Sequence, residues 1–454
     1  MELAQTFTHY STILSSPIND AVRKQISDAL GMAGSNYRNQ VYTQKFSGEK
    51  KNISVSDLSA FINTSLQFLE HSIKVNKRND NLYHAYNLLS YEESGIKISY
   101  LSEMLEGQVA VLSSGYLSAD ESLQLLDALR QSSLYRKDQN SYILYPNKAL
   151  PGFLQKNTIP QKAVEGSALL SKLVADNNLT VIEKDIRGAY HFNGNFRNAE
   201  DVKQALNELG AKYQLLVAKE KTKVLDIFEG VFNHKEFTGR SGTFYGYEGL
   251  GSVYWHMVSK LSLAAEETCV RAISEDAEEE TVSQLIDHYY EINEGIGVHK
   301  SPELFGAFPI TPYSHTPLHR GAQQPGMTGQ VKEDILCRIG ELGVYVENGR
   351  LKFNPRILRS NEFLKEEREV EIINVKGEKQ AITIEADALL FTYCQVPVMY
   401  IISDSEGLDI ERNDGTKNSY AVFELNEKDT IAVINRTGAV KQIKVHFGES
   451  RLIR

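Results

Sequence analysis

The hydrophobic periodicity of the chain changes near residue 345, and this change constrains the fold more than any other feature. Upstream, apolar residues recur every three or four positions, as over residues 54–75. Downstream, short β-branched and aromatic runs alternate with turns such as residues 413–416 (NDGT). The first pattern predicts amphipathic helices and the second predicts strands. We therefore predict a helical domain over residues 1–345 and an antiparallel β domain over residues 346–454.

The upstream part predicts helices separated by long loops. Helices are expected at residues 17–34, 54–75, 97–114, 118–134, 161–176, 199–210, 248–268, 278–294 and 329–342. The helix that follows Ser118 has Glu121 three residues later, which is the pattern of a capping box. The intervening loops at 134–160, 188–198, 233–247 and 295–328 are too rich in aromatic residues to be disordered. Long ordered loops are usually functional, so we expect these four to gather around a site.

This order of elements predicts a mainly α fold. An (α/α)6-type toroid, in which helices alternate between an inner and an outer ring, would place the loops of one end around a pocket. A small antiparallel β-sandwich would follow it, with strands expected at residues 349–358, 368–375, 379–404, 419–425, 430–436 and 440–447. From periodicity alone, an irregular helical bundle fits nearly as well.

Charge and cysteine content exclude several functions. The formal net charge is −10 and no basic block stands out, so neither nucleic acid nor an anionic membrane is expected as a partner. Cys269, Cys337 and Cys394 are few and far apart, which favours a reducing compartment over a disulfide framework. No secretory signal and no apolar run of about 20 residues is found. We expect a soluble cytoplasmic protein without a metal or other cofactor.

Residues 313–334 (YSHTPLHRGAQQPGMTGQVKED) concentrate small, polar and cationic groups just before a helix. The N-terminus of a helix carries about half a positive charge, and glycines let an anion approach its backbone. We therefore predict that His315, His319, Arg320, Thr328 and Gly329 bind phosphate or a carboxylate. In the alternative interpretation, Thr328 only caps the helix and the histidines bond to loop carbonyls. The spacing of the histidines would also permit a metal pair, but no third ligand is evident.

Residues 234–261 combine carboxylates with aromatic side chains, as sugar-binding sites do. A glutamate among aromatic rings has a raised pKa, which a general acid requires. Glu248 and Glu236 are therefore candidates for the catalytic acid, and Arg240, Tyr247 and Trp255 for substrate binding. Alternatively, Glu248 stabilises the helix N-terminus and Trp255 lies in the core.

Further polar residues near helix ends complete the predicted site. His84, Glu106, Asp138 and Gln324 are expected to bind substrate, although Glu106 could equally be a charge on a helix face. Glu333, at the start of the helix at 329–342, is a candidate base that would activate water.

A resemblance to a known family is carried by residues 313–358, in which Thr328-Gly329 precedes a helix and GVYVENGRLKFNPRI follows it. This segment resembles the C-terminal barrel end of cellobiose-phosphorylase-like enzymes with (α/α)6 barrels. In that family a histidine-containing loop and a Thr-Gly pair contact phosphate. Residues 246–261 resemble the helix that follows the family's catalytic loop, and the loose likeness spans about residues 230–450.

Two departures from that family are clear. Its catalytic acid is an aspartate in a Gly-Asp-Trp-Asn-Asp loop, and this chain has no such motif, so Glu236 or Glu248 would have to replace it. The family's N-terminal β-sandwich also has no counterpart here. This indicates either a missing N-terminal half or a fragment of a longer protein, and a homodimer is another possible assembly.

The function predicted from these residues is cleavage or phosphorolysis of a glycosidic bond, in an oligosaccharide or glycoside, by an inverting mechanism. Glu248 or Glu236 would protonate the leaving oxygen, and inorganic phosphate would be the co-substrate. Without phosphate, Glu333 or Glu106 would activate water, with the two carboxyls about 6.5–9.5 Å apart. The alternative is a non-catalytic carbohydrate-binding or assembly subunit.

Overall fold

In a computed structural model of the chain, the described residues are 2–46, 48–146, 153–233, 253–296, 315–316 and 330–453. The chain divides into two compact units, one formed by Met1–Tyr145 with Ser252–Arg454 and the other by Pro146–Gly251. This second unit lies within the predicted helical domain, residues 1–345, and was not predicted as a separate unit. The predicted boundary at residue 345 falls within the first unit.

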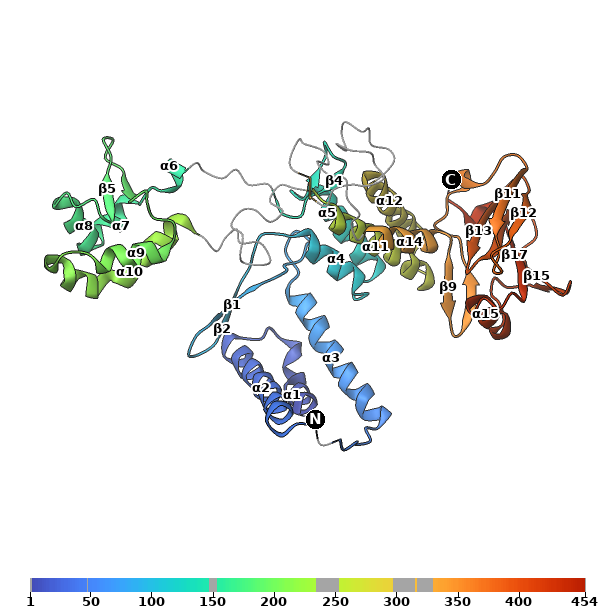
Figure 1. Cartoon of the computed structure of the whole chain (residues 1–454), viewed down its shortest axis with the longest axis horizontal. Coiled ribbons are helices and arrows are strands. Elements are labelled where there is room, and N and C mark those ends of the chain that lie inside the picture. The colour runs from blue at the N-terminus through green and yellow to red at the C-terminus, as the bar shows by residue number, and fades with distance from the viewer. Residues whose placement is uncertain are drawn as a thin grey trace. The chain divides into compact units, whose positions relative to one another are not determined.

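Among the described residues, two helical hairpins form the centre of the first unit (Figure 1). One consists of α4 (Leu105–Ser113) and α5 (Ala119–Gln131), and the other of α11 (Trp255–Ser274) and α12 (Glu279–Ile296). Helix α11 packs against α4, and α12 packs against α5. A further helix, α14 (Gln330–Glu341), also packs against α11.

The two hairpins lie side by side in the same orientation. Polar contacts join α5 to α12, and the partners in each are 161 residues apart: Asp120 with Thr281, Asp127 with His288, and Arg130 with Glu291. A constant separation means that the two helices run parallel and in register. Parallel hairpins of this kind are the repeating unit of an α/α toroid, although the described helices do not form a closed ring.

The predicted start of α5 is confirmed. The Glu121 backbone N–H donates to Ser118 Oγ (3.2 Å), and the Ser118 N–H donates to Glu121 Oε2 (3.1 Å), which completes the capping box. From this start the helix places Leu125 and Leu129 fully inside the core of the hairpins. Burial of a leucine side chain is worth about 1.5–3 kcal/mol, so the apolar stripe holds the two hairpins together.

The N-terminal part of the first unit departs from two predictions. Its elements are α1 (Glu2–Tyr10), η1 (Ser11–Ser15), α2 (Asp20–Asn39), η2 (Gln40–Gln44), α3 (Val55–Val75), β1 (Leu88–Tyr91) and β2 (Ile96–Ser99). Helix α2 does not end at Gly34 as predicted, because a glycine costs a helix only about 1 kcal/mol and does not break it. The helix predicted at residues 97–114 is divided between strand β2 and helix α4.

The second unit has a core of its own. Its elements are α6 (Phe153–Lys156), α7 (Gln161–Glu165), α8 (Ala168–Ala175), β5 (Ile182–Lys184), β6 (Tyr190–Phe192), α9 (Ala199–Asn207), η3 (Ala211–Tyr213) and α10 (Gln214–Phe232). The helix predicted at 161–176 is interrupted at Ser167, whose hydroxyl caps α8. Glu220 of α10 accepts hydrogen bonds from the N–H groups of Ala168 and Leu169, and so fixes α10 to the start of α8.

The C-terminal part of the first unit contains most of the strands. They are β9 (Val344–Glu347), β10 (Arg350–Phe353), β11 (Arg368–Ile373), β12 (Lys379–Ile384), β13 (Ala388–Tyr393), β14 (Val396–Ile402), β15 (Gly407–Arg412), β16 (Lys417–Tyr420) and β17 (Val440–Phe447), with η4 (Ser360–Glu362) and η5 (Glu449–Arg451). Strands β13 to β17 form a sheet in the order β13-β14-β17-β15-β16.

Two expectations for this part are wrong. The β14–β17 pair is parallel, so the sheet is mixed and not purely antiparallel. The strand predicted at residues 430–436 lies instead within helix α15 (Glu427–Ile434) and its C-terminal end. The side chain of Asn426 caps α15 by accepting from the N–H of Asp429, and this cap outweighs the β-branched composition of the run.

Side chains from both parts join the strands to the helices. Tyr290 on α12 donates to the Ile357 carbonyl (2.7 Å), and the Arg359 guanidinium lies 3.7 Å from the centre of the Tyr290 ring. Arg338 on α14 bonds to Glu362 on η4 (2.6 Å). The segment between β10 and β11 therefore contacts α12 and α14 directly. Among the described residues, no helix is both long and apolar enough to cross a membrane.

Candidate functional site

Helices α4, α11 and α14 run parallel, so their N-termini share one end. Cys337 on α14 contacts Ser262 on α11 (3.9 Å), and four residues later along α11 the carboxyl of Glu266 meets Gly340. Near the C-terminal end of α4, Ser113 bonds to Glu267 of α11. The first turns of the three helices, with Glu106, His256 and Glu333, are here called the three-helix end.

Short strands and turns bring further segments to the three-helix end. The N–H of Leu105 donates to the Leu144 carbonyl, just after strands β3 (Tyr135–Arg136) and β4 (Ser141–Tyr142). Strand β7 (Val253–Tyr254), which directly precedes α11, contacts β4 and pairs with β8 (His315–Thr316). The backbone of His315, a predicted phosphate ligand, therefore lies opposite Tyr254 at the start of α11.

The close approach of α12 to the β3–β4 turn completes this arrangement. A Cβ atom added to Gly295 would lie 2.2 Å from the Asn140 carbonyl oxygen, so only glycine fits there. The chain thus leaves α5 and α12, and enters α11 and α14, at the three-helix end. These are the helix ends that border three of the loops predicted to converge, at 134–160, 233–247 and 295–328. The fourth predicted loop, 188–198, belongs to the second unit.

Glu333 is the predicted catalytic residue that the structure describes. Its side chain is 5% exposed, and Oε2 is buried without a hydrogen-bond partner among the described residues. Lys332 Nζ lies 3.7 Å from Oε1. His256, on the first turn of α11, faces the charge of Glu333, but burial has the larger effect and lowers the pKa of the imidazole. A buried carboxyl and a neutral imidazole can bind hydroxyl groups or exchange a proton.

Trp255 does not have the role predicted for it. Its side chain is 0% exposed and belongs to the same core cluster as Leu105 of α4 and Leu285 of α12. A ring with no exposed face cannot stack on a sugar. The alternative weighed from the sequence, that Trp255 is a core residue, is the one the structure supports.

Three other predicted substrate residues lie in different surroundings. Glu106 is half-buried in the first turn of α4. Asp138 follows β3 and accepts two hydrogen bonds from the buried guanidinium of Arg136, at 3.1 and 2.7 Å. His84 stacks on Tyr100, with 4.0 Å between ring centres, and lines a separate groove of about 450 Å³ between α3 and α4. Most side chains of that groove are apolar, so it differs in chemistry from the three-helix end.

The remaining predicted site residues lie outside the described residues. They are Glu236, Arg240, Tyr247, Glu248, His319, Arg320, Gln324, Thr328 and Gly329, and the side chain of His315 also belongs to this group. Their roles remain predictions.

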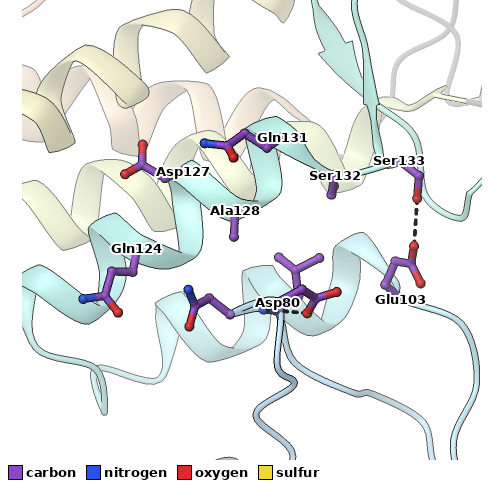
Figure 2. A pocket seen from close by; sticks show the side chains of 10 residues that line it. Asp80, Glu103, Gln124, Asp127, Ala128, Gln131, Ser132 and Ser133 are labelled. Carbon is purple, nitrogen blue, oxygen red and sulfur yellow. Dashed lines mark hydrogen bonds between the residues drawn. The ribbon is translucent and has the colours of Figure 1, made fainter.

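A polar pocket lies between α5 and the segments that precede α4 (Figure 2). Its volume is about 500 Å³, and its polar lining comprises Asp80, Asn81, Glu103, Gln124, Asp127, Gln131, Ser132 and Ser133. The Ser133 hydroxyl donates to Glu103 (2.7 Å), as Figure 2 shows, and Arg78 pairs with Asp80 (2.8 Å). Amides and partly neutralised carboxylates of this kind bind hydroxyl groups. None of these lining residues was predicted from the sequence.

The polar groups between α11 and α14 were likewise not predicted from the sequence. Glu266 lies there at 4% exposure, and burial together with the nearby Glu267 and Glu341 raises its pKa to about 8. Glu341 accepts from the Tyr289 hydroxyl (2.6 Å) and from Arg338 (2.6 Å). The sequence held one clue, since Glu266 occupies an apolar-periodic position in residues 261–269. No group of three or more potential metal ligands is found among the described residues.

Comparison with known families gives one finding. Residues 150–235 match GH149 phosphorylase insertion domain 2, and the match falls on the second unit, Pro146–Gly251. Comparison with curated proteins gave no match. This segment is therefore similar to a domain of a glycoside phosphorylase. The match does not extend to residues 313–358, on which the likeness to a cellobiose-phosphorylase-like barrel rests.

Proposed function

We propose that this chain takes part in the phosphorolysis of a glycosidic bond, in which inorganic phosphate replaces water as the nucleophile. The observation that carries the proposal is the match of residues 150–235 to an insertion domain of a glycoside phosphorylase. Such a domain interrupts a larger enzyme, and here the matched unit interrupts the helical first unit between α5 and α11.

The parallel helices α4, α11 and α14 support a location for the reaction. Three helix N-termini at one end create a positive potential that favours an anion. The backbone of His315 lies at the same end, opposite Tyr254. We place the phosphate there, held by His315, His319, Arg320 and the Thr328-Gly329 backbone.

In the proposed inverting mechanism, phosphate attacks the anomeric carbon while Glu248 or Glu236 protonates the departing glycosidic oxygen. The bond between that carbon and the phosphate oxygen forms as the glycosidic bond breaks, which yields a sugar 1-phosphate and a shortened glycan. Glu333 would then bind a substrate hydroxyl, because no base is needed to activate phosphate. If water replaced phosphate, Glu333 or Glu106 would act as the base.

The test is a screen of α- and β-linked disaccharides and oligosaccharides, with and without phosphate, that measures free sugar and sugar 1-phosphate. Phosphate-dependent formation of sugar 1-phosphate, abolished in Glu248→Gln or Glu236→Gln and retained in Glu280→Gln, would support the proposal. Glu280 is an exposed residue of α12 and serves as the matched control. Release of free sugar without phosphate would indicate a hydrolase.

A non-catalytic carbohydrate-binding or assembly subunit is the second candidate. It is favoured by the lack of a Gly-Asp-Trp-Asn-Asp segment in the sequence. Binding of an oligosaccharide with no turnover in either arm of the screen would select it. Calorimetry with phosphate separates the two further, because His319→Ala and Thr328→Ala should weaken anion binding only if the phosphate site exists.

A further inference from the structure

A buried carboxyl separates α11 from α14. Glu266 Oε1 is buried and has no hydrogen-bond partner, and Glu266 forms no ion pair with any residue that the structure describes. Buried carboxylates are normally paired, because an isolated ion loses its hydration without compensation. An unpaired buried carboxyl is therefore stable only when it carries its proton.

The opposing residue on α14 is a glycine, and the fit is close. A Cβ atom added to Gly340 would lie 1.7 Å from Glu266 Oε1 and 2.3 Å from its Cδ atom. The backbone of α14 thus rests directly against the carboxyl group of α11. Any change in the size or solvation of this group must act on the distance between the two helices.

The groups that face Glu266 disfavour its ionised form. On its own helix these are Glu267 and Cys269, and on α14 they are Cys337 and Glu341. Arg338, the nearby cation on α14, bonds to Glu341 and to Glu362 of η4 (2.6 Å each). From α12, the Tyr289 hydroxyl also donates to Glu341 (2.6 Å). The Tyr289 hydroxyl and the Arg338 guanidinium are therefore bound to other acids, and neither compensates a charge on Glu266.

We propose that the Glu266–Gly340 contact is a protonation switch, in which the neutral carboxyl lets α14 pack on α11 and loss of its proton loosens α14. The consequence reaches both ends of α14. The N-terminal end carries Glu333 into the three-helix end, and the C-terminal end leads into β9. The inference does not depend on the proposed function, because it concerns the packing of two described helices.

The direction of the pH effect follows from linkage. Burial, with Glu267 and Glu341, raises the pKa of Glu266 from 4.5 to about 8. A raised pKa means that the folded state holds the proton more tightly than the unfolded chain. The stabilisation is complete below about pH 4.5 and is lost as pH rises to about 8. Over this range the folding equilibrium should fall by up to about tenfold per pH unit, relative to a variant that does not titrate.

Amide hydrogen exchange of the full chain between pH 6 and pH 9 tests the switch, with protection factors corrected for the intrinsic effect of pH. We expect the protection of α14 in the wild type to fall tenfold or more between pH 6 and pH 8, while α5 changes less. In Glu266→Gln the protection of α14 should stay level, because the amide does not titrate. Glu275→Gln, at an exposed position just after α11, should follow the wild type.

Two results would overturn the proposal. One is an α14 profile in Glu266→Gln that falls in parallel with the wild type, and the other is wild-type protection of α14 that does not change from pH 6 to pH 9. If Glu266→Gln does not fold, Glu266→Met, which has similar length and no charge, replaces it. The wild-type comparison of α14 with α5 decides the question even without a variant.

Discussion

Replacing Gly340 by alanine should destabilise the chain, although the same change usually stabilises a helix. Residue 340 lies in the last turn of α14, where alanine is favoured over glycine by at most the roughly 1 kcal/mol found in a helix interior. At this position, however, the new methyl group would lie 1.7 Å from Glu266 Oε1, far inside the carbon–oxygen contact distance. Glu266 is buried at 4% exposure and has little room to move aside.

The magnitude follows from these opposing terms. Overpacking of a buried contact costs about 1–3 kcal/mol, and the gain in helix propensity offsets about 1 kcal/mol of it. We therefore expect Gly340→Ala to lower the free energy of unfolding by up to about 2 kcal/mol. In a Glu266→Ala background the obstructing carboxyl is absent, so there the same change should be neutral or stabilising by up to about 1 kcal/mol.

Urea unfolding followed by tryptophan emission measures this effect. Trp255 is the single tryptophan of the chain and is the first residue of α11, buried in the core that α11 shares with its neighbours, so its emission reports the unfolding of this core. Gly31→Ala is the matched control, because Gly31 lies inside α2 and an added Cβ would meet no described atom within 4 Å. The reasoning would be refuted if Gly340→Ala stabilised the protein as Gly31→Ala does, or if its cost were unchanged in the Glu266→Ala background.

Three further predictions concern capping, ion pairing and pH. Ser118→Ala removes the capping box of α5 and should cost about 1 kcal/mol in the same urea assay, whereas a loss below 0.3 kcal/mol (roughly the error of such a measurement) would contradict it. Asp429→Ala leaves Arg412 without its buried partner and should cost about 3–5 kcal/mol by circular dichroism, and an Arg412→Met partner change should recover part of that loss. The bond to the Asn157 carbonyl, aided by Asp185, raises the pKa of His191, so amide protection of β6 should be greatest below pH 6.5 and decline as pH rises through the raised pKa. A His191→Gln variant with the same decline would refute this assignment.

Local signals in the sequence predicted much of the fold correctly. The start of α5 follows from Ser118 and Glu121 alone, because a capping box depends on residues within one turn. The change to strands near residue 345 is likewise a local pattern. The strand predicted at residues 430–436 failed for a local reason too, since the cap at Asn426 lies just before the run and was overlooked.

Non-local features could not be predicted in this way. The register of α5 against α12 joins residues 161 positions apart, and the parallel β14–β17 pair joins strands between which β15 and β16 lie in sequence. Pro146–Gly251 form a separate unit although the helices there have the same periodicity as those of the first unit. Periodicity identifies the buried face of a helix, but it does not identify the helix that covers it.

In the candidate site, too, local signals could be recognised in the sequence and non-local contacts could not. The sequence proposed Glu333 and His315 as site residues because of the residue types next to a helix start, and both Glu333 and the backbone of His315 lie at the three-helix end. The sugar-binding role predicted for Trp255 is wrong, because the residue type alone does not distinguish an aromatic ring that binds a sugar from one buried in the core. Glu266 was missed because a single acid in an amphipathic helix is normally on the exposed face.

The contact between β4 and β7 has a consequence for how this chain could have grown. These strands lie on either side of the second unit in sequence, yet they meet within the first unit. The two strands that flank the second unit in sequence are therefore neighbours, and the closure entropy of a flexible loop between them rises by only about 0.6 kcal/mol for each doubling of its length. A short connection between β4 and β7 can therefore be replaced by an entire folded unit without separating these two strands.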